Sequence, residues 1–237
     1  MIIDKNLFVL KDRIIEYLKE SRDISSEEEK RISDDFLSKS ERAVIYLDFF
    51  KKNVSAGIKG KRILDFGSGD GVYAMEFSKA GASVVGIDID NVLVRITNEC
   101  AISEGLNVRF VNYGDGRIPF EDNHFEYAYC LQTFEHLHDP VYYLKELYRV
   151  LKKRGLLHIS FPNRFYPYDD HAQLPLTPWL SYKGADLLTI VCRKRSLKYY
   201  SDLHFYSYRK FKKIIDDSQA KFSIIMTSNK TSFIKNS

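Results

Sequence analysis

Short apolar runs alternate with helical patterns through residues 61–163, and each run leads into a polar turn. The runs cover residues 63–66, 84–88, 108–111, 127–132 and 155–160. Apolar runs of this length are typical of buried strands, and strands that alternate with helices are typical of a parallel sheet. The pattern therefore predicts a doubly wound α/β fold with a mostly parallel sheet.

The segments on either side of this core also carry regular patterns. Residues 1–60 read as helices, and Ser25 with Glu28 and Ser38 with Glu41 have the spacing of a capping box, which predicts a helix start at each. At the other end, a helix at 211–217 and a sixth strand at 222–226 are predicted. The chain is therefore expected to add helices before the sheet and one or two strands after the core.

A glycine-rich loop follows the first predicted strand. The strand ends near Asp65, glycines stand at 67, 69 and 71, and a helical pattern begins at Val72. Glycine lets the backbone turn sharply and lie against a ligand, and such a loop between a strand and a helix typically binds a nucleotide-like molecule. A dinucleotide site requires its third glycine at position 72, which is valine, and an acid before the loop is poorly suited to pyrophosphate. Asp65 favours a ligand that carries a positive charge.

The segment Asp65-Phe66-Gly67-Ser68-Gly69-Asp70-Gly71 resembles the first motif of class I S-adenosylmethionine-dependent methyltransferases. Further similarities follow in order and at the family's spacing: Val84–Asp88, Tyr113–Gly116, Ile118–Glu126 and Glu146–Lys152. Two departures are Glu126 in place of aspartate and Lys153-Arg154-Gly155 in place of Pro-Gly-Gly. Residues 61–163 are thus similar to the family, in particular to its type 11-like, small-molecule subgroup.

The resemblance implies a Rossmann-like sheet of six to seven strands, an N-terminal helical cap and a long insertion after strand 5. In similar methyltransferases the cap folds over the cofactor, although helices that merely extend the core are an equal alternative here. The family closes its sheet with an antiparallel seventh strand, for which only residues 232–234 remain. The sheet edge is expected to be truncated or to be completed by a partner chain, so a homodimer is considered.

The cofactor implied is S-adenosylmethionine, with S-adenosylhomocysteine (SAH) as product. In the family, the acid after the second strand accepts hydrogen bonds from both ribose hydroxyls, and an acid and a small residue after the third strand hold adenine. These positions are Asp88 and Asp115-Gly116. The full set of predicted cofactor residues is Asp65, Gly67, Ser68, Gly69, Gly71, Asp88, Ile89, Asp115, Gly116 and Gln132.

Residues 161–208 are predicted to form the acceptor side. Ligands of open α/β sheets lie beyond the carboxyl ends of the strands, and a connection of about 40 residues is much longer than usual, which favours a lid or binding insertion. The segment holds eleven aromatic residues in 48 positions. It loosely resembles methyltransferases of glycan, lipid-intermediate and secondary-metabolite pathways, which implies a small or lipid- or sugar-linked acceptor that is methylated at oxygen.

Transfer to oxygen usually requires a general base, and histidine is well matched to that role near neutral pH. His171 is the first candidate because it lies in the insertion beside two aspartates, although a solvated loop histidine is the alternative. His136 is the second, with a structural role as its alternative. His136 and His138 are too close together, and too poorly supported by other ligands, to indicate a metal.

Charge and cysteine content set further limits. The net charge is +4, and residues 161–237 hold 13 basic and 6 acidic side chains. This excess indicates either a solvated face or a surface that attracts an anionic acceptor, a membrane surface or nucleic acid. Three cysteines without metal-type spacing favour a reducing cytoplasm. No run approaches the roughly 18 apolar residues of a membrane span, and charges near the amino terminus argue against a secretory signal.

The sequence therefore predicts one cytoplasmic methyltransferase domain over residues 1–237, with a cap at 1–60, a cofactor core at 61–160, an insertion at 161–208 and a last helix and strand at 209–237. Two rival functions remain. An RNA methyltransferase is favoured by the basic clusters 193–195 and 210–213, but no recognisable RNA-binding module accompanies them. A non-catalytic cofactor-binding protein of the same fold is the other. Peripheral contact with a membrane stays open.

Overall fold

The computed structural model describes residues 5–22, 24, 26–54, 56–114, 116–162, 165–169, 174–193, 204–227 and 231–236. Two compact units are distinguished. The first comprises residues 1–119 with 125–127, and the second comprises residues 120–124 with 128–237. Each is described by itself.

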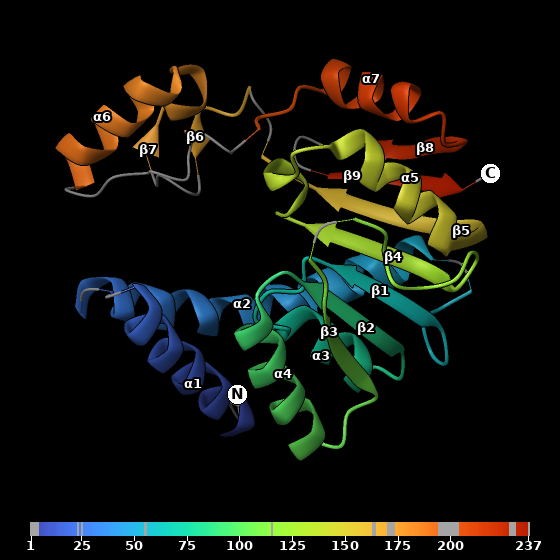
Figure 1. Ribbon diagram of the computed structural model, residues 1–237, viewed down its shortest axis with the longest axis horizontal. Coiled ribbons are helices and arrows are strands. Elements are labelled where there is room, and N and C mark those ends of the chain that lie inside the picture. The colour runs from blue at the N-terminus through green and yellow to red at the C-terminus, as the bar shows by residue number, and fades with distance from the viewer. Residues whose placement is uncertain are drawn as a thin grey trace. The chain divides into compact units, whose positions relative to one another are not determined.

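The first unit contains three parallel strands in the order β3-β2-β1. They are β1 (Arg62–Phe66), β2 (Ser83–Asp88) and β3 (Val108–Asn112) (Figure 1). Leu64 lies opposite Val85, which in turn lies opposite Arg109. β1 and β2 are apolar because both are covered on their two faces, and Ile63, Leu64 and Ile87 are completely buried.

Two helices connect these strands. They are α3 (Val72–Lys79) and α4 (Asn91–Ser103). α4 begins at the cap residue Asp90, whose carboxylate accepts hydrogen bonds from the backbone N–H groups of Val92 and Leu93 at 3.0 and 3.1 Å. Asp88, the last residue of β2, is thus followed two residues later by Asp90, which caps α4.

Two long helices precede the sheet, α1 (Lys5–Arg22) and α2 (Ser26–Asn53). α1 packs against α4, as Figure 1 shows, and α2 packs against α3. Ring contacts join α2 to α3, with Phe50 and Phe77 centroids 5.2 Å apart and those of Tyr46 and Tyr73 5.6 Å apart. The N-terminal helices therefore belong to the packed core of the first unit.

The predicted helix start at Ser38 is wrong. α2 runs without a break through this position, so the backbone N–H groups near Ser38 already have helical partners. The Ser38 hydroxyl instead donates to the carbonyl of Asp35, 2.8 Å away, within the same helix. Serine in a helix interior commonly bonds back in this way, which satisfies its hydroxyl without ending the helix. Ser25, the residue of the other predicted cap, lies outside the described residues, directly before the observed start of α2.

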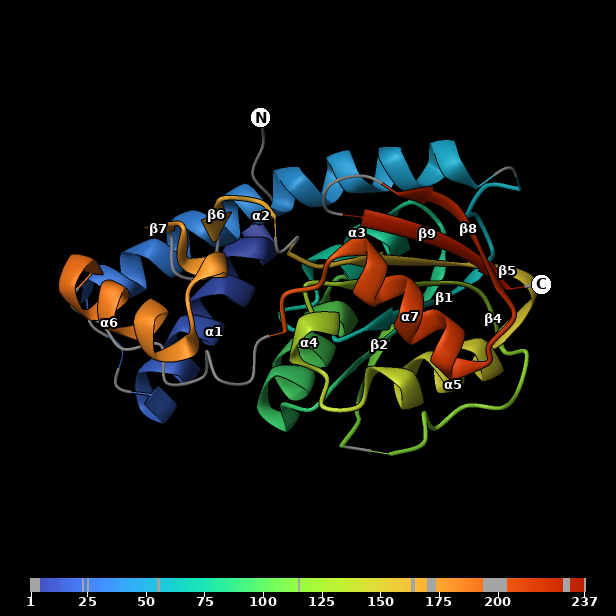
Figure 2. The ribbon, with the colours of Figure 1, turned by 90° about the horizontal axis from the view of Figure 1, so that it is seen from above.

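The second unit has the strand order β4-β5-β9-β8. These strands are β4 (Phe125–Leu131, whose first three residues belong to the first unit), β5 (Leu151–Ser160), β8 (Phe222–Thr227) and β9 (Thr231–Asn236). Its helices include η1 (Phe134–His136), α5 (Pro140–Val150) and α7 (Tyr208–Ser218). α5 and α7 pack side by side, as Figure 2 shows.

The expectation of a truncated sheet edge is wrong. β9 lies antiparallel between β5 and β8, and Ile234 pairs with Leu157 on one side and Ile224 on the other. Six residues in a strand extend about 20 Å, which is sufficient to pair along much of β5. The chain itself therefore supplies the antiparallel strand, and no partner chain is required for it.

β5 begins four residues before its predicted start at Gly155. It follows α5 at once, because Leu151 is already extended. Arg154 takes a left-handed conformation with a φ of 62° inside this strand. The departure from Pro-Gly-Gly thus coincides with an irregular strand instead of a separate turn.

The predicted insertion after β5 contains short elements of its own. They are β6 (Tyr168–Asp169), β7 (Leu174–Pro175), η2 (Thr177–Trp179) and α6 (Tyr182–Arg193). Leu174 and Ala185 are buried together, with Leu188 and Phe205 packed against them. The insertion thus has a small apolar cluster of its own.

The predicted mostly parallel α/β fold is confirmed, with seven strands in the main sheet of the described residues and β9 antiparallel. No helix in the described part of the chain is both long and apolar enough to cross a membrane.

Candidate functional site

The glycine loop, residues 67–71, is held against the end of β2. Its three glycines have positive φ angles of 79°, 51° and 72° at 67, 69 and 71. The N–H groups of Gly67 and Ser68 both donate to the carbonyl of Ile87, at 2.9 and 3.0 Å. The predicted glycines are therefore required by the backbone conformation, because other residues adopt positive φ at a cost.

The three glycines do not all serve the same purpose. A Cβ atom on Gly71 would lie 2.6 Å from the Phe110 ring, and one on Gly86 in β2 would lie 2.5 Å from it. A Cβ on Gly69 would meet nothing within 4 Å. Gly71 and Gly86 therefore make room for Phe110 of β3, whereas Gly69 borders open space that a ligand can enter.

Phe110 and Gly86 help to set the conformation of the loop, and the sequence analysis did not single them out. The Asn98 side chain of α4 fixes Phe110, since it accepts from the Phe110 N–H at 2.8 Å and donates to the Phe110 carbonyl at 2.7 Å. A glycine inside an otherwise apolar strand often marks a close approach, and that signal at Gly86 was available in the sequence.

Asp88 and the glycine loop are brought together, as predicted. One carboxylate oxygen of Asp88 accepts from the Gly69 N–H at 2.7 Å, and the other accepts from the Asp90 N–H at 3.0 Å. A carboxylate has about four acceptor positions, so two hydrogen bonds leave room for two more. The carboxylate is thus oriented by the backbone and still able to accept from a ligand.

Two further polar groups of the predicted set are buried here. Asp65 is 3% exposed at the end of β1, and Ser68 is 8% exposed. Among the described residues, no hydrogen-bond partner is found for the Ser68 hydroxyl. A buried hydroxyl without a partner costs about 1–3 kcal/mol, which a polar ligand atom at the loop would relieve. The open side of Gly69 and this hydroxyl fit a polar cofactor.

The segment after β3 also reaches the tip of β2. The N–H of Tyr113 donates to the carbonyl of Asp88 at 2.8 Å, and its hydroxyl donates to the carbonyl of Gly116. Ile89, directly after Asp88, is 76% exposed and presents an apolar side chain to solvent. Asp115 lies outside the described residues. Of the other predicted first-unit residues, Asp65 and Asp88 lie near the ends of β1 and β2, and the rest lie on the loops after β1, β2 and β3.

The remaining predicted residues belong to the second unit. Gln132 and His136 are exposed, on the segment that follows β4. Gln132 has a φ of 54°, and its N–H donates to the carbonyl of Ser160 at 2.9 Å. His136 lies in η1, where its N–H donates to the carbonyl of Thr133 at 3.0 Å. His171 lies outside the described residues.

Comparison with known proteins identifies the core. Residues 64–159 match a family described as a methyltransferase domain. A ubiquinone biosynthesis O-methyltransferase of Haemophilus ducreyi is 32% identical over 117 residues, which are 46% of this chain and 48% of the relative. Residues 64–159 form a class I methyltransferase domain. A protein of the same name from Pseudomonas aeruginosa is 29% identical over 110 residues, 46% of this chain and 47% of the relative. The chain spans about half the length of the curated relatives it matches.

Solved structures share the fold of this methyltransferase domain. A magnesium protoporphyrin IX methyltransferase from Synechocystis with bound SAH aligns with a TM-score of 0.62 at 15% identity, over 95% of this chain and 94% of that one. A SAM-dependent methyltransferase from Aquifex aeolicus gives 0.55 at 20% identity, over 83% and 87%. The predicted methyltransferase family is confirmed for residues 64–159, and the solved structures share the predicted fold.

The second unit also contains buried polar groups that the sequence analysis did not predict. Glu135 is 1% exposed, and its backbone carbonyl accepts from the N–H of His204 at 2.8 Å. Burial, and secondarily the Glu135 carboxylate, raises the pKa of Tyr206 to about 12. Burial lowers the pKa of His158 in β5 to about 3, so this histidine is neutral at physiological pH. The sequence does not mark these groups as buried, because their burial depends on packing between separate segments of the folded chain.

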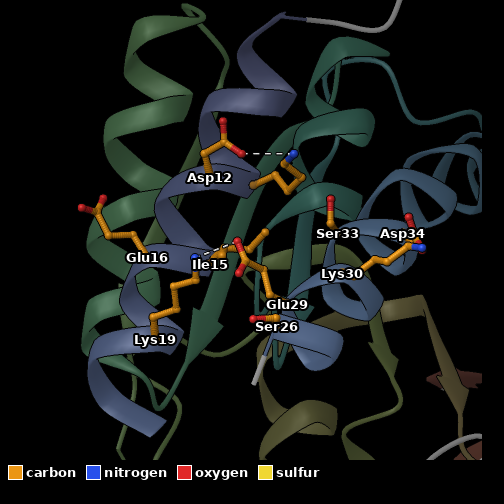
Figure 3. Close-up of a pocket in the computed structure, with 10 residues that line it drawn as sticks. Asp12, Ile15, Glu16, Lys19, Ser26, Glu29, Lys30, Ser33 and Asp34 are labelled. Carbon is orange, nitrogen blue, oxygen red and sulfur yellow. Dashed lines mark ion pairs between the residues drawn. The ribbon is translucent and has the colours of Figure 1, made fainter. Parts of the chain in front are cut away.

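A separate cleft of about 700 Å³ lies between the two N-terminal helices of the first unit (Figure 3). Its walls are charged, and an ion pair between Lys19 and Glu29 crosses from α1 to α2 at 2.7 Å. None of the predicted site residues lines it. Within the described residues, no group of three or more histidine, cysteine, aspartate or glutamate side chains is arranged to hold a metal.

Proposed function

We propose that this protein transfers the methyl group of S-adenosylmethionine to an oxygen atom of a small or lipid- or sugar-linked metabolite in the cytoplasm. The observation that supports it most directly is the Asp88 carboxylate, fixed by the N–H groups of Gly69 and Asp90 beside the open side of Gly69. An oriented carboxylate next to a positive-φ loop suits a ligand with vicinal hydroxyls and a cationic group.

The predicted cofactor residues are proposed to contact different parts of S-adenosylmethionine. Asp88 accepts from the ribose hydroxyls, and Asp65 attracts the cationic amino-acid end. The exposed Ile89 side chain offers an apolar surface for the adenine ring. The other proposed contacts are Gly67, Ser68, Gly69 and Gly71 of the glycine loop, with Asp115, Gly116 and Gln132.

The chemistry required of the chain is mainly alignment. The cofactor supplies an electrophilic methyl group on sulfur, and transfer is an in-line displacement by the acceptor oxygen, so correct positioning accounts for much of the rate. A general base accepts the proton of the acceptor hydroxyl on an imidazole nitrogen. His171 is the first candidate for this base and His136 the second.

Oxygen methylation of a small molecule is supported by the relatives, which are O-methyltransferases of ubiquinone biosynthesis. The insertion adds a second argument. Phe165, Tyr166 and Trp179 are 70%, 41% and 53% exposed, which provides flat apolar surface for an acceptor with a ring or chain. A single domain over residues 1–237 is part of the same proposal.

The proposal is tested by binding and turnover. Calorimetry is expected to show SAH binding to the purified protein, and transfer of labelled methyl groups is expected with a panel of hydroxylated aromatic and prenylated compounds. His171→Ala is expected to lower turnover and leave SAH affinity unchanged. Absence of SAH binding would reject the function. Binding without transfer would favour the non-catalytic rival, and steeply salt-dependent RNA affinity would favour the RNA methyltransferase.

A further inference from the structure

A lysine of the N-terminal helices reaches the glycine loop. The ammonium nitrogen of Lys39, in the middle of α2, lies 2.6 Å from a carboxylate oxygen of Asp70. Asp70 stands between Gly69 and Gly71, so this contact falls on the loop itself. The two side chains are only 26% and 18% exposed, which limits screening of the ion pair by water.

The same carboxylate joins Lys39 to the start of α3. The second oxygen of Asp70 accepts from the Val72 N–H at 3.3 Å, and the Lys39 ammonium lies 5.8 Å from the centre of the Tyr73 ring. Burial lowers the pKa of Lys39, but the Asp70 carboxylate, together with Tyr73 and Asp35, outweighs this effect, and the net pKa is raised. Lys39 is therefore a cation at physiological pH, held between the loop and the first turn of α3.

The helix that carries Lys39 is itself fixed in place. Tyr46 of α2 contacts both Tyr73 and Phe77 of α3, with ring centroids 5.6 and 5.8 Å apart. These contacts lie two turns along α2 from Lys39, so the lysine extends from a packed interface. The ion pair thus connects the loop to a helix that is itself held in place by packing against α3.

The helix α1 makes a comparable contact with the next loop. The Tyr17 hydroxyl donates to the carboxylate of Asp90 at 3.0 Å. Asp90 caps α4 and its N–H donates to Asp88, the proposed ribose ligand. Both N-terminal helices therefore contact a loop that carries proposed cofactor residues.

We propose that Lys39 is a positioning residue that holds the glycine loop, through Asp70, in the conformation that binds the cofactor. The physical reason is entropic. Three glycines within five residues give the loop many alternative conformations, and ordering it upon binding costs free energy. An ion pair to a fixed helix removes part of that cost before the ligand arrives. This inference rests on the proposed function, because it concerns the same cofactor site.

The test uses the full chain with SAH as the probe. Lys39→Met and Asp70→Asn are each expected to weaken SAH binding about tenfold in calorimetry. The double variant is expected to bind no more weakly than the worse single variant, because both changes remove one interaction. Lys39→Arg is expected to restore affinity to within about threefold, since it keeps the charge. A double variant in which the two losses multiply would overturn the pairing.

Lys19→Met provides a matched control. Lys19 is also a lysine of the N-terminal helices and forms an ion pair of 2.7 Å with Glu29, but its partner lies on α2 and not on a loop. The two side chains are 49% and 36% exposed. SAH affinity is expected to change less than twofold. A loss equal to that of Lys39→Met would show a general effect of the helices, which would overturn the specific role of Lys39.

Amide hydrogen exchange without ligand separates positioning from overall stability. The N–H groups of Gly69 and Gly71 are hydrogen bonded to Asp88 and Ser68, and both are expected to exchange at least fivefold faster in Lys39→Met. Core amides of β1 are expected to be unchanged. Unchanged loop exchange together with wild-type SAH affinity would overturn the proposal.

The two hypotheses fail in different ways. A wild-type protein that does not bind SAH contradicts the proposed function, and the exchange experiment still decides whether Lys39 orders the loop. If Lys39→Met does not fold, Asp70→Asn tests the same ion pair from the loop side, with the thermal midpoint as the measure of folding.

Discussion

The glycine loop and the insertion, residues 161–208, are the two regions proposed to contact ligands, and they are built differently. The conformation of the loop is fixed by packing against Phe110 of β3 and by hydrogen bonds to β2. The insertion has a small cluster around Leu174 and Ala185, while Phe165, Trp179 and Leu187 are 70%, 53% and 63% exposed.

This difference indicates how each region responds to substitution. A residue packed against Gly71 affects folding and binding together, because the Phe110 ring leaves no space for a larger side chain there. An exposed residue of the insertion contributes little to folding, so it is free to serve acceptor recognition. The glycine loop is expected to be sensitive to substitution and the exposed residues of the insertion tolerant of it.

The largest expected effect is that of Gly71→Ala. A Cβ there would lie 2.6 Å from the Phe110 ring on a backbone with a φ of 72°. Overpacking and backbone strain together are expected to lower the free energy of unfolding by about 3 kcal/mol. Gly69→Ala is the control, since its Cβ would meet nothing within 4 Å, and about 1 kcal/mol is expected from its φ alone. Urea unfolding measures both, and equal losses would contradict the role of Phe110.

Acid is expected to destabilise the second unit through His158, in the strand that precedes the insertion. Its pKa is about 3 when folded, against an ordinary 6.5. The stability that the neutral, buried imidazole allows is fully present above pH 6.5. It is lost progressively as the pH falls toward 3, because the unfolded chain takes up the proton first. The expected loss between pH 7 and pH 5 is about 2 kcal/mol. Urea unfolding of the wild type and of His158→Gln at both pH values checks this, and identical pH dependence would refute it.

Asp88→Ala tests the proposed cofactor site directly. The change removes the acceptor of two backbone hydrogen bonds and the proposed ribose ligand. SAH affinity is expected to fall more than tenfold, which corresponds to about 1.4 kcal/mol or more. Asp12→Ala, at a 69% exposed side chain of α1, is the control and is expected to bind SAH normally. Unchanged calorimetric affinity in Asp88→Ala would remove its ribose role.

The smallest expected effect on stability belongs to Trp179→Ala in the insertion. Because Trp179 is 53% exposed, the free energy of unfolding is expected to change by less than about 0.5 kcal/mol, with SAH affinity unchanged. The KM for the acceptor is expected to rise. Leu174→Ala, at a 9% exposed position, is expected to lower stability by about 2 kcal/mol or more. A destabilisation by Trp179→Ala as large as that of Leu174→Ala would erase the contrast between the two regions.

Local patterns alone determined much of the methyltransferase core. The strand, loop and helix around residues 63–72 were predicted, and the structure has them. These features depend on neighbouring residues, because a glycine sets the conformation of its own backbone. The position of Asp65 and Asp88 near the ends of β1 and β2 was predicted from local patterns in the same way.

Packing between distant segments decided the rest. Gly71 is required by Phe110, about forty residues further along, and Lys39 meets Asp70 across 31 positions. Ser38 does not start a helix because α2 continues past it, and residues 231–236 form a strand because β5 and β8 both pair with them. No local pattern encodes such contacts, since their energies arise only when the folded chain brings separated residues within a few ångströms of each other.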